Sequence, residues 1–166
     1  MIPFCLIVGD STGVGTAAAL AAQGIRCEVQ AKVGASSARV LQAQPAGAIA
    51  GRAVIAVGSN DPDNPRLMQN LSALRGRLVA GHVTWLAPYN RKAAAVVTAL
   101  AYSRRDSVVQ LSSYPSRDRL HPASYRQVAS GLGWSDDAIT KPAGMRYSLP
   151  RTPTAQPARQ AVVIAF

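Results

Sequence analysis

Three side chains of this sequence have the types and spacing of a nucleophilic catalytic set: Ser11, Asp118 and His121. A serine hydroxyl becomes a nucleophile when an imidazole accepts its proton, and a carboxylate can hold that imidazole in the accepting tautomer. Asp118 lies three residues before His121, close enough in the chain for this second task. We therefore predict acyl-transfer chemistry, with Ser11 as nucleophile, His121 as general base and then acid, and Asp118 as the residue that orients His121.

An acyl-transfer site also needs hydrogen-bond donors for the oxyanion of its tetrahedral intermediate. Two candidates follow apolar segments: Gly34 comes after residues 26–32, and Asn60 comes after residues 52–58 in the sequence GSND. We predict an oxyanion hole made of the backbone N–H of Ser11, the backbone N–H of Gly34 and the side-chain amide of Asn60.

The elements that must position these residues alternate between strands and helices. Apolar runs and two-residue alternation predict strands, and alanine-rich or leucine-rich segments between turn formers predict helices. The expected strands are 4–9, 26–32, 52–58, 81–87 and 107–111; the expected helices are 16–24, a short one capped by Ser36 or Ser37 and running through Leu41, 66–76, 91–103, and 121–133 with Pro122 in its first turn.

This alternation predicts a three-layer α/β/α, flavodoxin-like domain around a five-stranded parallel sheet. Every candidate site residue then follows a strand at the carboxyl edge of the sheet, which is where open parallel sheets place their sites. The topology thus gives residues far apart in the sequence a common location.

Other interpretations of the glycine-rich stretch at residues 9–16 fit less well. A phosphate-binding loop needs a lysine directly before its hydroxyl residue, and here Gly15 precedes Thr16. The nucleophile elbow of α/β-hydrolases needs several preceding strands, and only ten residues precede Ser11. We set both aside.

A dinucleotide-binding turn stays open as an alternative. Gly9, Gly13 and Gly15 can be placed on the glycine-rich turn of a Rossmann unit. An acidic residue is expected about 20 positions further on, but the second apolar run ends in Lys32. A basic residue there suits the phosphorylated ribose of NADP, so an NADP-binding oxidoreductase remains possible, although the Tyr-x-x-x-Lys of short-chain dehydrogenases is missing.

Four blocks, taken in order, resemble those of the SGNH or GDSL hydrolases: GDSTGVG at 9–15, VGASS around Gly34, VGSND at 57–61 and DRLHP at 118–122. The ordered set covers residues 4 to about 132. The resemblance implies the SGNH-type α/β/α fold, ester hydrolysis through an acyl-enzyme, Ser11, Asp118 and His121 as its triad, and Gly34 and Asn60 as oxyanion donors. We expect neither a cofactor nor a metal, because no cluster has metal-ligand spacing.

Composition bears on partners and compartment. The 18 lysines and arginines against 8 aspartates and glutamates give a net charge of +10, which makes an anionic glycan an attractive partner. We expect no nucleic-acid binding and no membrane insertion, and the oligomeric state stays open.

The N-terminal apolar run lacks a basic flank and a cleavage site, so we expect no signal peptide or transmembrane segment. We therefore expect cytoplasmic action by default, with phage-borne or non-classical export as alternatives. Cys5 and Cys27, on neighbouring expected strands, are expected to be buried free thiols.

The sequence divides near residue 132. Residues 1–132 carry the alternating elements and the four blocks, whereas residues 133–166 lose periodicity, contain several prolines and end in AVVIAF. We expect this extension to pack back on the domain or to serve in association. Short loops predict an open site, which suits removal of a small acyl group, acetyl first, from a carbohydrate or similar carrier. A non-catalytic binding or assembly module with the same fold is a further alternative.

Overall fold

A five-stranded sheet forms the centre of the computed structural model, which describes residues 3–134, and its strands run in the order β2-β1-β3-β4-β5. Every strand pair in it is parallel. The strands are β1 (Cys5–Gly9), β2 (Glu28–Ala31), β3 (Ala48–Ala56), β4 (Leu78–Ala87) and β5 (Ser107–Gln110). The helices are α1 (Ser11–Ala22), α2 (Ser37–Ala43), α3 (Leu67–Gly76), α4 (Arg91–Arg104) and α5 (Tyr125–Gly131), with a 3-10 turn, η1, at Leu111–Ser113.

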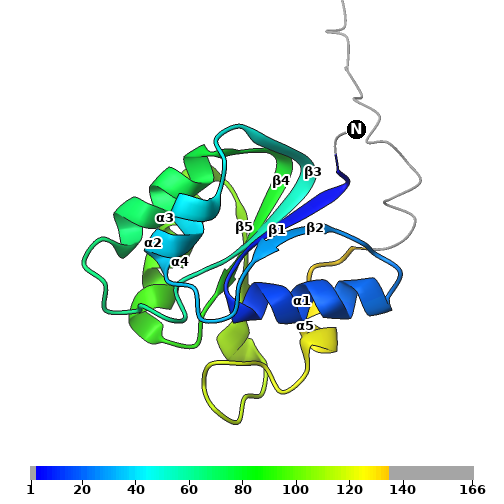
Figure 1. The fold of residues 1–166 in the computed structure, drawn as a ribbon. Coiled ribbons are helices and arrows are strands. Elements are labelled where there is room, and N and C mark those ends of the chain that lie inside the picture. Colours follow the sequence, from blue (N-terminus) through cyan, green and yellow to red (C-terminus); the bar gives the residue numbers. More distant parts are fainter. Residues whose placement is uncertain (1–2, 135–166) are drawn as a thin grey trace, which may run out of the picture.

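Helices cover both faces of the sheet. In Figure 1, α2, α3 and α4 lie on one face, while α1 and α5 lie together on the other. The order of the strands reverses at β1, because β2 lies on one side of it and β3 on the other. The expected three-layer, flavodoxin-like α/β/α fold with a five-stranded parallel sheet is confirmed.

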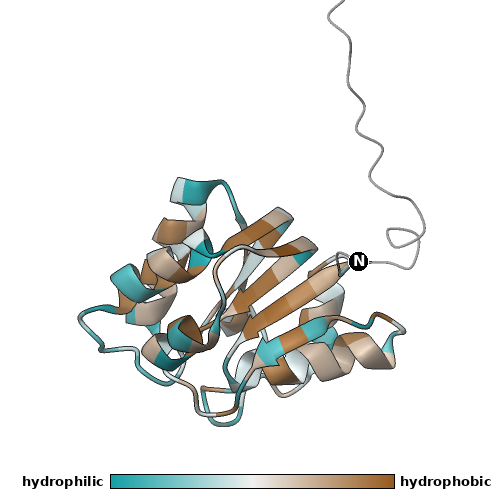
Figure 2. Cartoon of the chain, turned by 45° about the horizontal axis from the view of Figure 1, so that its top comes forward, coloured by the Kyte–Doolittle hydropathy of each residue, from teal (hydrophilic) through white to brown (hydrophobic). Residues whose placement is uncertain are grey.

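Strand β1 explains why the sheet lies inside the domain. All five of its residues are buried, and successive side chains point to opposite faces. Leu6 and Val8 pack with the α2, α3 and α4 layer, whereas Cys5 and Ile7 pack with the α1 and α5 layer. Figure 2 shows the resulting pattern, with hydrophobic strands at the centre and hydrophilic residues mainly on the loops and on the outer sides of the helices of the α2, α3 and α4 layer. Burying each large aliphatic side chain contributes about 1.5–3 kcal/mol, so the alternation holds both layers on the sheet.

The expectation that Cys5 and Cys27 are free thiols is wrong, because they form a disulfide. The parallel register pairs Leu6 with Glu28, so the preceding residues of the two strands lie side by side, with their Cα atoms 4.7 Å apart. The bridge ties the N-terminal end of β1 to the segment that enters β2.

Two helices begin at other residues than expected. Helix α1 begins at Ser11 and not at residue 16, because Asp10 caps it: the Asp10 side chain accepts the Thr12 N–H. Helix α5 begins at Tyr125 and not at residue 121, so Pro122 lies outside it, in an isolated bridge with Ser116. As a result, Ser11 lies in a helix and not in the loop before it, and His121 lies in a loop and not in the last helix.

Three further features complete the fold. Ser36 caps α2, as expected, by accepting the Arg39 N–H at 3.4 Å. Strands β3 and β4 extend further toward their N-termini than expected, because residues 48–50 pair with residues 78–80. Within residues 3–134, no helix combines the length and the apolarity needed to cross a membrane. The expected packing of the C-terminal extension concerns residues that lie, beyond 134, outside the described part of the chain.

Candidate active site

The three catalytic candidates meet at the carboxyl edge of the sheet. Ser11 is the first residue of α1, two residues after the last residue of β1, and its Oγ lies 2.9 Å from Nε2 of His121. His121 lies 110 positions later, in the loop between η1 and α5. On the opposite side of the imidazole, Nδ1 lies 2.7 Å from Oδ2 of Asp118. The two hydrogen bonds form one continuous chain from the hydroxyl to the carboxylate.

The loop that carries Asp118 and His121 is held by local hydrogen bonds. Oδ1 of Asp118 accepts the backbone N–H groups of Leu120 at 2.9 Å and His121 at 2.7 Å, an Asx-type turn. Ser116 Oγ donates to the His121 carbonyl at 2.6 Å, and the Tyr89 hydroxyl donates to the Tyr114 carbonyl at 3.1 Å. One carboxylate oxygen thus shapes the loop, which leaves the other for the imidazole.

Asp118 stays ionised because of these contacts. Hydrogen bonds from the backbone N–H and the ring of His121, and then from the backbone of Leu120, hold the pKa of Asp118 well below its ordinary value. The site is open to solvent: the side chains of His121 and Asp118 are 37% and 53% exposed. A hollow of about 350 Å³, lined in part by Arg117 and Ala123, lies beside them. The candidate triad is therefore accessible from solvent.

Asp10 is a buried residue beside the candidate site whose contacts sequence reasoning missed. Its Oδ1 accepts both the N–H and the hydroxyl of Thr12, at 2.9 and 2.8 Å, and its Oδ2 accepts the Ser59 N–H at 3.3 Å. Burial raises the pKa of Asp10, and the hydrogen bonds from Thr12 and Ser59 offset part of this rise. Asp10 therefore caps the helix that begins with Ser11 and ties it to the loop after β3. An aspartate directly before a helix start was the available signal.

The loops after β2 and β3 bring the two oxyanion candidates close to each other. The side-chain amide of Asn60 donates to the carbonyl of Ala35 at 3.0 Å, and Ala35 directly follows Gly34. Gly34 is exposed with a φ of 74°, a left-handed conformation that favours glycine. Among the described residues, no hydrogen bond joins Gly34 or Asn60 to Ser11. Their donor role remains a prediction.

Asp61 stabilises the same two loops through hydrogen bonds. Its carboxylate accepts the N–H of Ser37 at 3.0 Å and the hydroxyl of Ser37 at 2.5 Å, and Asn64 donates to it at 2.9 Å. Asp61 therefore connects the loop after β3 to the start of α2. Asp63, in contrast, is exposed and pairs with Lys92 at the surface.

Tyr125 packs against helix α1, which begins with Ser11. A Cβ on Gly15, one turn after Ser11, would overlap the Tyr125 ring, so the glycine permits this close packing. Burial raises the pKa of Tyr125 to about 12, and the charges of Asp10 and Asp118 add to the rise. The Tyr125 hydroxyl is buried and has no hydrogen-bond partner among the described residues. The tyrosine therefore stays protonated and acts here as packing.

The N-terminus of α1 is poorly suited to a dinucleotide. Gly13 and Gly15 lie inside the helix and do not form a loop around a phosphate. The Asp10 carboxylate already occupies the cap position, where a pyrophosphate would bind. Within residues 3–134, no three histidine, cysteine or carboxylate side chains gather as a metal-ligand group.

Comparisons with known proteins bear on the fold. No protein-family model and no curated protein matches this sequence. Among solved structures, the chain is similar to Est24, a carbohydrate acetylesterase from Sinorhizobium meliloti, with a TM-score of 0.60, 13% identity and coverage of 78% of this chain and 97% of that one.

Two further structures are similar to this chain. The C-terminal catalytic domain of peptidoglycan O-acetyltransferase A from Streptococcus pneumoniae has a TM-score of 0.54, 17% identity and coverage of 84% and 91%. The aryl esterase of M. smegmatis has a TM-score of 0.54, 16% identity and coverage of 77% and 95%. At such identities the likeness establishes the fold alone: this chain has the fold of the SGNH/GDSL hydrolases.

Proposed function

We propose that this protein is a serine esterase that removes a small acyl group, acetyl first, from a carbohydrate or similar carrier. The observation that carries the proposal is the continuous hydrogen-bond chain from Ser11 Oγ through His121 to Asp118. A lone serine at a helix start is usually a cap, but here Asp10 is the cap, which leaves the Ser11 hydroxyl to bond the imidazole.

The reaction follows from this geometry. Ser11 Oγ attacks the ester carbonyl while His121 Nε2 takes its proton, and the resulting imidazolium is stabilised by the ionised Asp118. The oxyanion accepts hydrogen bonds from the Ser11 N–H, the Gly34 N–H and the Asn60 amide. His121 returns the proton to the leaving alcohol, which breaks the ester bond and leaves an acyl-enzyme. Water, deprotonated by the same imidazole, attacks the acyl-enzyme and releases the acid and free Ser11.

The proposed substrate class rests on exposure and on the neighbours. A triad whose carboxylate is 53% exposed leaves room for a bulky alcohol. Two of the similar structures are a carbohydrate acetylesterase and a peptidoglycan O-acetyltransferase domain, which supports acetyl groups and carbohydrate carriers. The net charge of +10 favours an anionic carrier.

The disulfide between Cys5 and Cys27 bears on where this reaction takes place. Disulfides persist in oxidising environments and are rare in the reducing cytoplasm. We therefore favour an oxidising compartment over the cytoplasm that was the default expectation, which also agrees with a cell-surface or extracellular glycan as substrate.

The test is covalent labelling with a fluorophosphonate, followed by intact mass and peptide mapping. We expect one adduct, on Ser11, and its loss in both Ser11→Ala and His121→Ala. Circular dichroism of each variant would verify that it is folded. A folded wild-type protein that takes no adduct would refute the esterase, and the non-catalytic module and the NADP-binding oxidoreductase would then take its place.

A further inference from the structure

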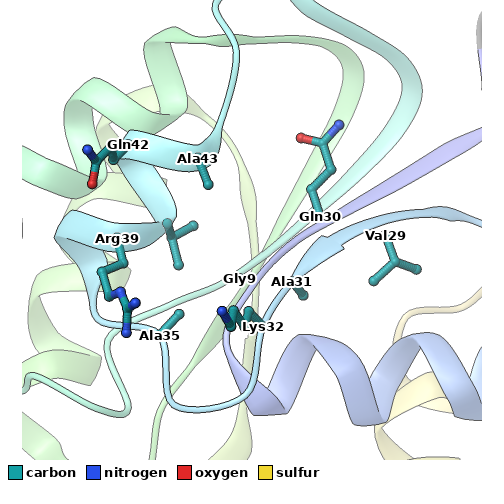
Figure 3. Close-up of a pocket in the computed structure, with 10 residues that line it drawn as sticks. Gly9, Val29, Gln30, Ala31, Lys32, Ala35, Arg39, Gln42 and Ala43 are labelled. Carbon is teal, nitrogen blue, oxygen red and sulfur yellow. The ribbon is translucent and has the colours of Figure 1, made fainter.

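A second hollow lies at the edge of the sheet, between β2 and α2. Its volume is about 390 Å³, within the roughly 300–1,000 Å³ that small-molecule sites occupy. Its walls are largely apolar and come from Ala31 on β2, Ala35 in the following loop, and Val40 and Ala43 on α2. Figure 3 shows Ala31, Ala35 and Ala43 around the hollow.

Two cationic side chains border this apolar surface. Lys32 follows β2 and Arg39 lies on α2, so they come from the two walls of the same hollow. Among the described residues, neither takes part in an ion pair, and no carboxylate lines the hollow. Two positive charges without a neutralising partner favour an anionic ligand, and a carboxylate fits the donors of Arg39 in particular.

Gln30 adds a third recognition element. Its Nε2 donates to Oε1 of Glu28 at 2.6 Å, and because an ionised carboxylate only accepts hydrogen bonds, this contact fixes the orientation of the amide. Gln30 Oε1 is buried and has no partner among the described residues. Figure 3 shows this oxygen on the side of the amide that faces α2. A buried acceptor without a donor lowers the stability of the fold, so a hydrogen bond to this oxygen from an O–H or N–H group of a ligand would be favourable.

The hollow adjoins the candidate active site. It is lined by Gly9, two residues before Ser11, and by Ala35, whose carbonyl accepts the amide of Asn60. A molecule bound in the hollow therefore touches the residue on which the Asn60 side chain rests. The hollow thus shares residues with the strand end that precedes Ser11 and with the loop that contacts Asn60.

We propose that this hollow binds a carboxylate-bearing sugar unit of the ester's carrier. The carboxylate lies between Lys32 and Arg39, a sugar hydroxyl donates to Gln30 Oε1, and the C–H face of the ring packs on Ala35, Val40 and Ala43. This inference rests on the proposed function for its kinetic consequence, but its binding step does not need an active nucleophile.

The first test therefore measures binding, with the ¹⁵N chemical shifts of the wild-type protein as the readout. The probes are methyl glucuronoside and methyl glucoside, which differ only at C6, where the first has a carboxylate and the second a hydroxymethyl group, and adenosine 2′-phosphate. We expect saturable shifts at the Gln30 side-chain amide and the Lys32 backbone with the glucuronoside, and roughly tenfold weaker binding of the glucoside. Equal binding of the two sugars, shifts confined to other surfaces, or a clear preference for the nucleotide would overturn the proposal.

A matched pair of variants separates the hollow from the general positive charge. Lys32→Gln/Arg39→Gln should abolish the tenfold preference, whereas Arg91→Gln/Arg104→Gln, on the exposed face of α4, should keep it. If both double variants lose the preference equally, the overall charge and not the hollow is responsible.

The second test is kinetic. Wild-type protein should hydrolyse a mono-O-acetylated methyl glucuronoside with a higher kcat/KM than the acetylated glucoside, and the Lys32→Gln/Arg39→Gln variant should bring this ratio to about one. If the two kcat/KM values of the wild-type protein are about equal, the hollow does not contribute to substrate recognition. Failure of Ser11 labelling with intact glucuronoside binding would refute the esterase and retain the sugar site; labelled Ser11 without binding would do the reverse.

Discussion

Substitution of Asp118 by asparagine separates the role of this carboxylate in the loop from its role in catalysis. The amide oxygen of the new side chain can take the place of Oδ1 and keep the hydrogen bonds from the Leu120 and His121 backbones. The amide nitrogen then replaces Oδ2 and directs a donor at Nδ1 of His121. Only the tautomer with its proton on Nε2 accepts that donor, and in this tautomer the ring cannot take the proton of Ser11.

The size of the effect follows from the exposure of the carboxylate. Where a buried aspartate orients the histidine, the same change lowers kcat about 10⁴-fold. The Asp118 side chain is 53% exposed, so water can replace part of its interaction with the ring. We therefore expect a loss of about 10³-fold in kcat, equivalent to about 4 kcal/mol of barrier.

The assay is hydrolysis of p-nitrophenyl acetate, with Asp63→Asn as the control. Asp63 is an exposed aspartate that pairs with Lys92, and its loss should leave kcat unchanged because surface ion pairs contribute little. Retention of more than a tenth of the wild-type kcat by a folded Asp118→Asn protein would refute the orienting role.

The same variant makes a pH prediction for stability. The pKa of Asp118 is lowered in the folded chain, so its stabilising effect is complete above the ordinary value of 3.8 and is lost as the pH falls through the folded pKa. Chemical denaturation at several acidic pH values should show this loss in the wild type and a smaller one in Asp118→Asn. Equal losses would mean that Asp118 forms no such bonds in solution.

Four further substitutions test the proposed oxyanion hole, the packing behind Ser11 and the disulfide. Asn60→Ala should lower kcat about a hundredfold, since one oxyanion donor is worth about 3 kcal/mol; unchanged turnover would exclude Asn60 from the mechanism. Gly15→Ala should lower the free energy of unfolding by about 1–3 kcal/mol, because its Cβ overlaps the Tyr125 ring, whereas Tyr125→Phe should cost nothing, because it removes an unpartnered hydroxyl; denaturant titration compares the two. Cys27→Ser removes a bridge between residues 22 positions apart and should lower the free energy of unfolding by about 3 kcal/mol, and equal stability of this variant and oxidised wild type would contradict a structural role.

The fold could be predicted from the sequence because its strands carry an unusually plain signal. The residues of β1 and the second half of β3 are continuous apolar runs, which only strands buried on both faces require. The alternation with helices then permits few topologies. The ends of elements were harder, because they depend on pairing: residues 48–50 look like part of a turn after Pro45 and Gly47, yet they extend β3 by pairing with residues 78–80.

The grouping of the catalytic candidates could also be predicted, and for a topological reason. Parallel strands end at one edge, so residues after β1 and β5 share that edge whatever their separation in the sequence. The pairing of Cys5 with Cys27 could in principle have been derived from the same parallel register. It was missed because the alternation along β2 shows which of its side chains share a face of the sheet but not its register against β1, and a shift of one residue decides which side chains meet.

Asp10 shows what neither composition nor spacing reveals. Its carboxylate caps α1 through Thr12 and holds the loop after β3 through the Ser59 N–H. Ser11 belongs to the first of these elements and Asn60 to the second, so one buried side chain sets the position of the proposed nucleophile relative to the proposed oxyanion donor. Burial disfavours its charge, as the direction of its pKa shift shows, and the three hydrogen bonds compensate for this in part. A group retained at that cost between the start of α1 and the loop after β3 acts by fixing their relative positions, and this role can be recognised only when both elements are seen together.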